Sequence, residues 1–289
     1  MELNTLLQYE PYSTARTEKR ALYAGLLTGL TQFHREHCPE YGRLLDALGC
    51  PAHMDCTVEN TPMLPVSLFK ELELRSIPEG EVFKTITSSG TTGQRVSRIF
   101  LDGATSACQQ QALCQIMSDF LGERRLPFLV LDSRQVLRNR AMFSARGAGI
   151  LGFSIFGTRP CYALDEHMEL DLDGVRAFLE EHQGETIFLF GFTFIIWKHV
   201  VRALEERGER LDIPNGILVH GGGWTQLAGE AVSPGAFKAR VAAATGVERV
   251  STSYGMADKP GCSSPACPPG RPHARTWPAT ATRRGRAYT

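Results

Sequence analysis

The chain contains one short segment of hydroxyl residues and glycines, TSSGTTGQ, whose residue types are suited to binding phosphate. Glycines let a backbone approach a ligand closely, while hydroxyl and backbone N–H groups can donate hydrogen bonds to phosphate oxygens. The segment matches neither the GxxxxGK[ST] pattern of a Walker loop nor the GxGxxG pattern of a dinucleotide loop. We interpret it as a phosphate-binding loop of another class, with an ordinary Ser/Thr/Gly turn as the alternative. The candidate residues are Thr87, Ser88, Ser89, Gly90, Thr91, Thr92, Gly93 and Gln94.

Two arginines lie just after this loop, Arg95 directly behind Gln94 and Arg98 three residues further on. A guanidinium group can donate to phosphate, although its planar fork differs in geometry from the compact charge of a lysine. Arg98 is therefore a candidate catalytic residue.

A run of three glycines follows a predicted strand in the segment VHGGGW. Without side chains, such a turn lets a flat ring lie against the backbone, as an adenine would. The candidate ligand-binding residues here are His220, Gly221, Gly222 and Gly223. An ordinary glycine turn is the alternative, and we expect His220 to shape the strand end rather than to act as a base.

The apolar pattern alternates between strands and helices along most of the chain. After a helix at 18–36 and a short helix within 66–74, it predicts strands at 99–101, 128–132, 186–190, 217–220 and 249–253. It predicts helices at 105–121, 138–151, 174–182, 193–207 and 234–244, the last with Ser233 as its cap and Pro234 in its first turn. This alternation indicates an α/β fold in which helices cover the strands on both faces.

The bulk composition excludes several classes of protein. The chain has 289 residues, 43% of them hydrophobic, and equal numbers of acidic and basic residues, so a sizeable core is possible and no affinity for nucleic acid is expected. The eight cysteines show no CxxC pairing, which argues against a zinc site or a disulfide framework. Neither a secretion signal nor a membrane span is indicated, and we expect a cytoplasmic protein.

The motifs together resemble those of a known family, the acyl-protein synthetases of the LuxE type. These enzymes are the ATP-dependent component of the fatty acid reductase that supplies bacterial luciferase with aldehyde, and they belong to the adenylate-forming, AMP-binding superfamily. The resemblance covers roughly residues 5–258 and is carried by LPVSLFKELELRS, TSSGTTGQRVSRIFLD, FGFTFIIWKHVV, VHGGGW and SYGM.

The resemblance implies a large α/β AMP-binding domain in which helices cover mixed β-sheets. It further implies that ATP and Mg²⁺ are used, that Tyr254 and Gly255 bind the adenine of ATP, and that the carboxylate of Asp258 acts in catalysis as a ligand of Mg²⁺. A long-chain fatty acid would be activated as acyl-AMP and passed to a protein cysteine as a thioester, with a reductase or transferase subunit as a possible partner. Two alternatives remain open: an acid:CoA ligase of the phenylacetate type, and a non-catalytic remnant that only binds nucleotide.

The composition changes sharply after Asp258. Residues 259–289 contain six prolines and six Lys or Arg, but no acidic residue and no Leu, Ile, Val or Phe. Such a segment cannot bury enough apolar surface to become ordered, so we expect a disordered tail. The Gln-x-Gly segment, ribose-binding Asp, hinge and C-terminal lid that the family implies are not found in it.

One base inserted within codon 258 permits a translation that begins Glu-Gln-x-Gly, the continuation that the family implies. We therefore expect an incomplete AMP-binding domain at 1–258, an out-of-frame tail at 259–289, and little or no ligase activity from this chain.

Overall fold

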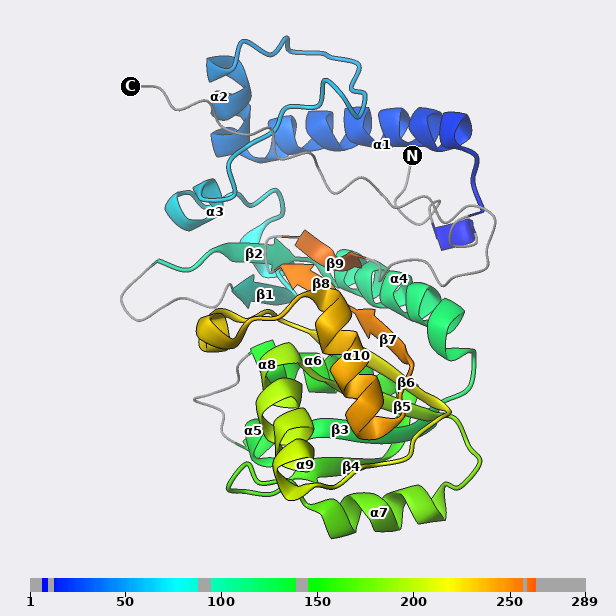
Figure 1. The fold of residues 1–289 in the computed structure, drawn as a ribbon. Helices are drawn as coiled ribbons and strands as arrows, with labels where there is room; N and C mark the ends of the chain where they lie inside the picture. The colour runs from blue at the N-terminus through cyan, green and yellow to red at the C-terminus, as the bar shows by residue number, and fades with distance from the viewer. Residues whose placement is uncertain (1–6, 10–12, 88–94, 139–144, 257–258, 264–289) are drawn as a thin grey trace.

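The structure is a computed structural model that describes residues 7–9, 13–87, 95–138, 145–256 and 259–263. Its centre is a five-stranded parallel sheet with the strand order β4-β3-β5-β6-β7 (Figure 1). The strands are β3 (Leu126–Ser133), β4 (Gly157–Leu164), β5 (Ile187–Phe192), β6 (Gly216–Gly221) and β7 (Arg249–Thr252). The sequences of β3, β5 and β6 are runs of apolar residues that are almost wholly buried, as is typical of parallel strands covered on both faces.

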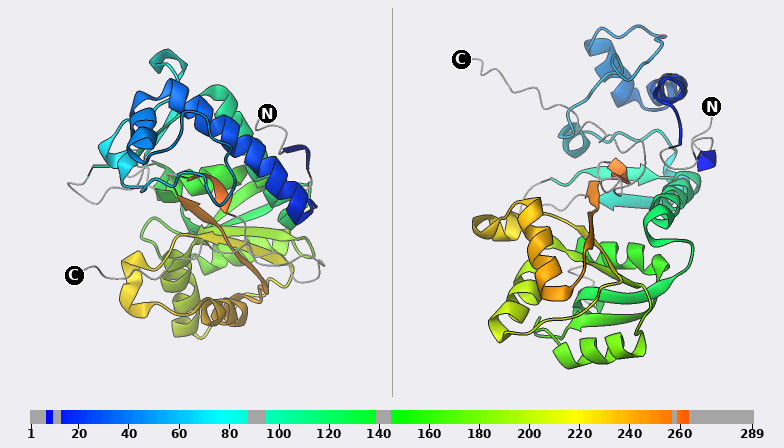
Figure 2. Two further views of the ribbon diagram at one scale, coloured as in Figure 1. Left: turned by 90° about the horizontal axis from the view of Figure 1, so that it is seen from above. Right: turned by 45° about the vertical axis from the view of Figure 1, so that its right-hand side comes forward.

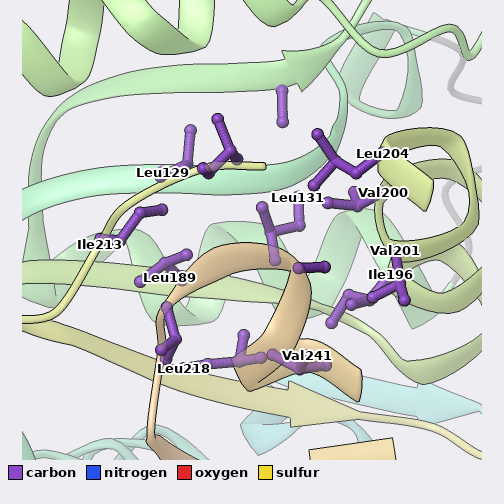
Figure 3. Close-up of a cluster of buried hydrophobic side chains, with 14 of the residues drawn as sticks. Leu129, Leu131, Leu189, Ile196, Val200, Val201, Leu204, Ile213, Leu218 and Val241 are labelled. Atoms are coloured by element: carbon purple, nitrogen blue, oxygen red, sulfur yellow. The ribbon is translucent and has the colours of Figure 1, made fainter. Parts of the chain in front are cut away.

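Helices cover both faces of this sheet. Because successive side chains of a strand point to opposite faces, Leu129 and Leu131 belong to one core cluster, whereas Phe128 and Val130 belong to the other. The first cluster lies under α7 (Leu172–Glu181), the continuous helix formed by α8 (Thr193–Ile195), η5 (Ile196–Val201) and α9 (Arg202–Arg207), and α10 (Pro234–Thr245) (Figure 3). The second lies under α4 (Gly103–Leu121), α6 (Ala145–Phe153) and η4 (Ser154–Phe156).

The remaining elements precede the parallel sheet or follow its last strand. Helices α1 (Arg16–His37) and α2 (Pro39–Ala47) pack together at one end of the molecule, and α3 (Leu68–Glu71) and η2 (Glu79–Glu81) lead to an antiparallel hairpin. That hairpin consists of β1 (Lys84–Thr87) and β2 (Arg98–Leu101). Strands β8 (Tyr254–Met256) and β9 (Lys259–Ser263) form a second antiparallel pair. Short helices α5 (Gln135–Arg138) and η6 (Thr225–Glu230) complete the fold.

The α/β fold class is confirmed, with local differences from the predicted elements. Ser233 caps α10 as expected, since its hydroxyl accepts a hydrogen bond from the N–H of Ala236. The helix predicted at 193–207 contains a π-helical segment, η5. Of the helix predicted at 138–151, Arg138 ends α5 and residues 145–151 belong to α6, while residues 139–144 lie outside the described part.

Strands β4 and β9 are among those that the sequence pattern did not predict. Strand β4, GTRPCYAL, is interrupted by Pro160 and lies at the edge of the sheet, where a proline is tolerated because one side of the strand needs no partner. Strand β9 begins the segment that was expected to be disordered. In the structure these five residues pair with β8, which satisfies backbone hydrogen-bonding groups without large apolar side chains. The disordered tail at 259–289 stays a prediction. Residues 264–289 lie outside the described part. No helix of that part is long and apolar enough to cross a membrane.

Candidate functional site

The carboxyl ends of the central strands meet at one edge of the parallel sheet, and ligands of open α/β sheets bind beyond this edge. Chain segments leave β5, β6 and β7 here at Thr193, Gly222 and Ser253. The run VHGGGW, predicted from sequence as a ligand-binding turn, therefore lies where the fold favours a ligand.

His220 is the buried centre of this edge, with 5% of its surface exposed. Its Nδ1 lies 2.9 Å from the hydroxyl oxygen of Thr193, and its Nε2 lies 3.1 Å from the hydroxyl oxygen of Thr252. Burial and, to a lesser extent, the nearby charge of Lys238 lower the pKa of His220 to about 4. The imidazole is therefore neutral at pH 7 and fully engaged, which favours the predicted structural role over that of a base.

The glycine turn after β6 is fixed by contacts from neighbouring strands. The Thr193 hydroxyl donates to the carbonyl oxygen of Gly221 at 3.0 Å and to that of Gly222 at 3.2 Å. Gly222 has φ +72°, and a Cβ there would lie 2.9 Å from Cδ1 of Phe192. Only glycine fits this position without strain. By contrast, a Cβ on Gly223 would meet no atom within 4 Å, so the turn is open on that side.

The phosphate loop is framed by the β1–β2 hairpin. Thr87 and Arg98 face each other in its register, so the two ends of the loop are neighbours across two paired strands. Residues 88–94, which include Ser88, Ser89, Gly90, Thr91, Thr92, Gly93 and Gln94, lie outside the described part of the chain. The hairpin lies close to the β8–β9 pair, which leaves the sheet at the carboxyl end of β7 (Figure 1; Figure 2).

Arg98 and Arg95 are both paired with acidic residues around α3. Arg98 lies 3.5 Å from a carboxylate oxygen of Glu73, and Arg95 lies 3.0 Å from one of Glu71. More than half of the Arg98 side chain is exposed, and such surface pairs contribute little to stability. A phosphate group could therefore replace Glu73 as the partner of Arg98 at a low energetic cost.

The third predicted motif begins at the paired strand β8. Tyr254 and Gly255 belong to β8, where Tyr254 pairs with Ser263 in the register with β9. The N–H of Ser253 donates to the carbonyl oxygen of His220 at 2.7 Å, which connects the start of this motif to the end of β6.

Mg²⁺ cannot be placed from the described residues. Asp258, the predicted ligand, lies outside them, and within them no group of three or more His, Cys, Asp or Glu could hold a metal ion.

Sequence reasoning missed three residues that the fold brings to this edge. Thr193 follows β5 and Thr252 ends β7, the two strands on either side of β6, and their hydroxyl groups lie on either side of the His220 ring. Asp132, fully buried in β3, binds the guanidinium of Arg146 from α6, with Nε 3.0 Å from Oδ2. The available signal was a polar residue directly after an apolar run, at 132 and 193; Thr252 follows Ser251 and had no such signal.

Together, the parallel sheet, the covering helices and the polar strand ends define an α/β fold with a candidate ligand site at the carboxyl edge of the sheet. Two solved structures of 2-hydroxyisobutyryl-CoA ligase in complex with 2-HIB-AMP and CoA have a similar fold. The open conformation has a TM-score of 0.57 and 16% identity over 87% of this chain and 55% of that one. The structure in the thioesterification state has a TM-score of 0.55 and 18% identity over 84% of this chain and 49% of that one. The chain thus spans about half the length of these enzymes.

The family model of the acyl-protein synthetase LuxE matches residues 2–285. The chain belongs to this family. The match continues beyond residue 258, where the sequence interpretation ended the resemblance, and the proposed boundary between domain and out-of-frame tail stays a prediction. A comparison with curated protein sequences finds no match.

Proposed function

We propose that this chain carries the nucleotide-binding part of an ATP-dependent ligase that activates a long-chain fatty acid as acyl-AMP. The acyl group then passes to a cysteine of a partner protein. Membership of the LuxE family over residues 2–285 is the observation that carries this proposal. The neutral, buried His220 and the glycine turn that follows it support a nucleotide site at the end of β6.

The reaction has two steps. First, a carboxylate oxygen of the acid forms a bond to the α-phosphorus of ATP. The bond between this phosphorus and the oxygen that bridges the α- and β-phosphates breaks, and pyrophosphate leaves with that oxygen. Second, a cysteine thiolate of the partner attacks the acyl carbon and displaces AMP. In the first step TSSGTTGQ would hold the departing pyrophosphate, and Arg98 would stabilise its charge by leaving Glu73.

The proposal is tested in two measurements on the whole chain. Equilibrium dialysis with labelled ATP measures whether the site binds nucleotide. A single-turnover assay, with the chain in excess over a radiolabelled fatty acid in the presence of ATP and Mg²⁺, measures acyl-AMP even when turnover is slow. ATP-dependent label in acyl-AMP supports the proposal. Absence of both ATP binding and acyl-AMP contradicts it.

The acceptor is tested separately. Acyl-AMP formed in the assay is offered to CoA and to a reductase subunit of the fatty acid reductase, and mass spectrometry identifies the thioester. Acyl-protein as the product supports the proposed transfer. Acyl-CoA as the sole product would reassign the chain to the acid:CoA ligases, and ATP binding without acyl-AMP would leave only a nucleotide-binding function.

A further inference from the structure

The hydroxyl of Thr193 has more than one partner at the carboxyl edge of the sheet. Its oxygen lies within hydrogen-bond distance of Nδ1 of His220 and of the carbonyl oxygens of Gly221 and Gly222. Thr193 is 4% exposed and is the first residue of the long helix after β5, whereas its partners belong to β6 and the turn that follows. A single buried hydroxyl therefore connects two adjacent strands at the place where each ends.

The hydrogen-bonding capacity of these groups sets their direction. A threonine hydroxyl has one hydrogen to donate, and a backbone carbonyl can only accept. If Thr193 donated to Nδ1 of His220, the carbonyl groups of Gly221 and Gly222 would lose this donor. All contacts are satisfied when Nδ1–H of His220 donates to Thr193, Thr193 shares its one hydrogen between the two carbonyl groups in a bifurcated bond, and Thr252 donates to Nε2.

This directed chain of hydrogen bonds acts on the turn itself. It begins at Thr252 on β7, crosses His220 on β6 and ends on the carbonyl groups of the glycine turn. The turn carries no side chains that could hold it by packing at 221–223, and φ at Gly222 is positive. The conformation of the turn therefore depends on the hydrogen bonds from Thr193 and on the Phe192 side chain that lies beside Gly222.

We propose that Thr193 is a positioning residue of the nucleotide site, which holds the backbone of the glycine turn in the conformation that accepts ATP. His220 and Thr252 orient the Thr193 hydroxyl so that its hydrogen points to the turn. This proposal rests on the proposed function, because it takes the turn to be part of the ATP site.

The test compares Thr193→Val, which keeps the shape but removes the hydroxyl, with Thr193→Ser, which keeps the hydroxyl. For each variant, dialysis gives the Kd for ATP, and the single-turnover assay gives the half-saturating ATP concentration and the maximal rate. Thr193→Val should raise the Kd and the half-saturating concentration about tenfold, equivalent to about 1.4 kcal/mol, and change the maximal rate by much less. Thr193→Ser should restore most of the affinity.

Thr245→Val is the matched control. Thr245 is also 4% exposed, and its hydroxyl donates to the carbonyl oxygen of Val241 at 2.7 Å within α10, away from the glycine turn. It should lower the free energy of unfolding without a change in the Kd for ATP. If Thr193→Val does not fold, Thr252→Val takes its place, since it removes the donor to Nε2 of His220 at the other end of the chain of hydrogen bonds.

The outcomes separate the two proposals. If the unmodified chain binds ATP and Thr193→Val binds it equally well, the positioning role is wrong and the proposed function stands. An equal loss of affinity in Thr245→Val would also overturn the positioning role, because general destabilisation would explain it. If the unmodified chain binds no ATP, both proposals are wrong.

Discussion

The carboxylate of Asp132, wholly buried at the carboxyl end of β3, binds both Nε and Nη2 of Arg146 on α6. The N–H of Ser133 also donates to Oδ1 of Asp132, at 2.7 Å. The Arg146 side chain is 22% exposed, and its guanidinium carbon lies 6.0 Å from the ring centre of Phe194. This bidentate ion pair connects α6 to the carboxyl edge of the sheet, where the candidate site lies.

The ion pair predicts an asymmetric response to mutation. Arg146→Met should lower the free energy of unfolding by about 3 kcal/mol, because it leaves a buried carboxylate without its cation. Urea unfolding followed by circular dichroism measures the change. Arg146→Met combined with Asp132→Asn should recover part of this loss, since no unpaired charge then remains. If the double variant is less stable than Arg146→Met alone, the buried charge is not the cause.

His220 predicts a pH dependence of stability. Its pKa is lowered to about 4 in the folded chain, against 6.5 for an unperturbed histidine. Between pH 6.5 and about 4 the unfolded chain takes up a proton at this histidine that the folded chain does not. The contribution of neutral His220 to the free energy of unfolding is therefore complete above pH 6.5 and is lost as the pH falls to about 4. The loss amounts to about 3 kcal/mol.

The variant His220→Asn isolates this contribution. Asparagine does not titrate and keeps a donor near the position of Nδ1, so the free energy of unfolding should depend less steeply on pH between 6.5 and 4. Urea unfolding at a series of pH values gives the slopes. Thr245→Val serves as the control, since it lowers stability without removing a histidine. Parallel slopes for the unmodified chain and His220→Asn would contradict the lowered pKa.

Gly222 and Gly223 offer a matched pair of substitutions within one turn. Gly222→Ala places a Cβ at φ +72° and 2.9 Å from Phe192 Cδ1, whereas the added Cβ of Gly223→Ala meets no atom within 4 Å. A left-handed conformation costs a non-glycine residue about 1–2 kcal/mol. Gly222→Ala should therefore lower the midpoint of thermal unfolding clearly, and Gly223→Ala should change it little. Equal midpoints would show that the turn adapts to the added methyl group.

The sequence predicts the elements that depend on local pattern. Apolar runs predict β3, β5 and β6, and the Ser-Pro pair at 233–234 predicts the start of α10. Strand β4 has no such pattern, because an edge strand with Pro160 needs neither a continuous apolar run nor all of its N–H groups.

The partners within the site could not be predicted in this way. That Thr193 reaches His220 depends on β5 and β6 being neighbours, which is a property of the strand order. The pairing of Arg98 with Glu73 likewise depends on how α3 lies against β2. A motif indicates which residue types occur at a strand end, whereas the hydrogen bonds between ends require the topology.

Arg98 is a sequence-predicted residue whose described side chain can contact phosphate. Its pair with Glu73 is exposed, with 54% and 44% of the two side chains accessible, so Arg98→Gln should change the free energy of unfolding by less than about 0.5 kcal/mol. If Arg98 leaves Glu73 to bind phosphate, the same variant should raise the half-saturating ATP concentration about tenfold in the single-turnover assay.

The control is Arg176→Gln, which breaks a comparably exposed pair with Glu209 on the α7 side of the sheet. It should leave both quantities unchanged. The two pairs are alike in exposure. If both variants raise the half-saturating ATP concentration equally, Arg98 acts only through the surface charge of the chain. If only Arg98→Gln raises it, the guanidinium of Arg98 contacts the nucleotide.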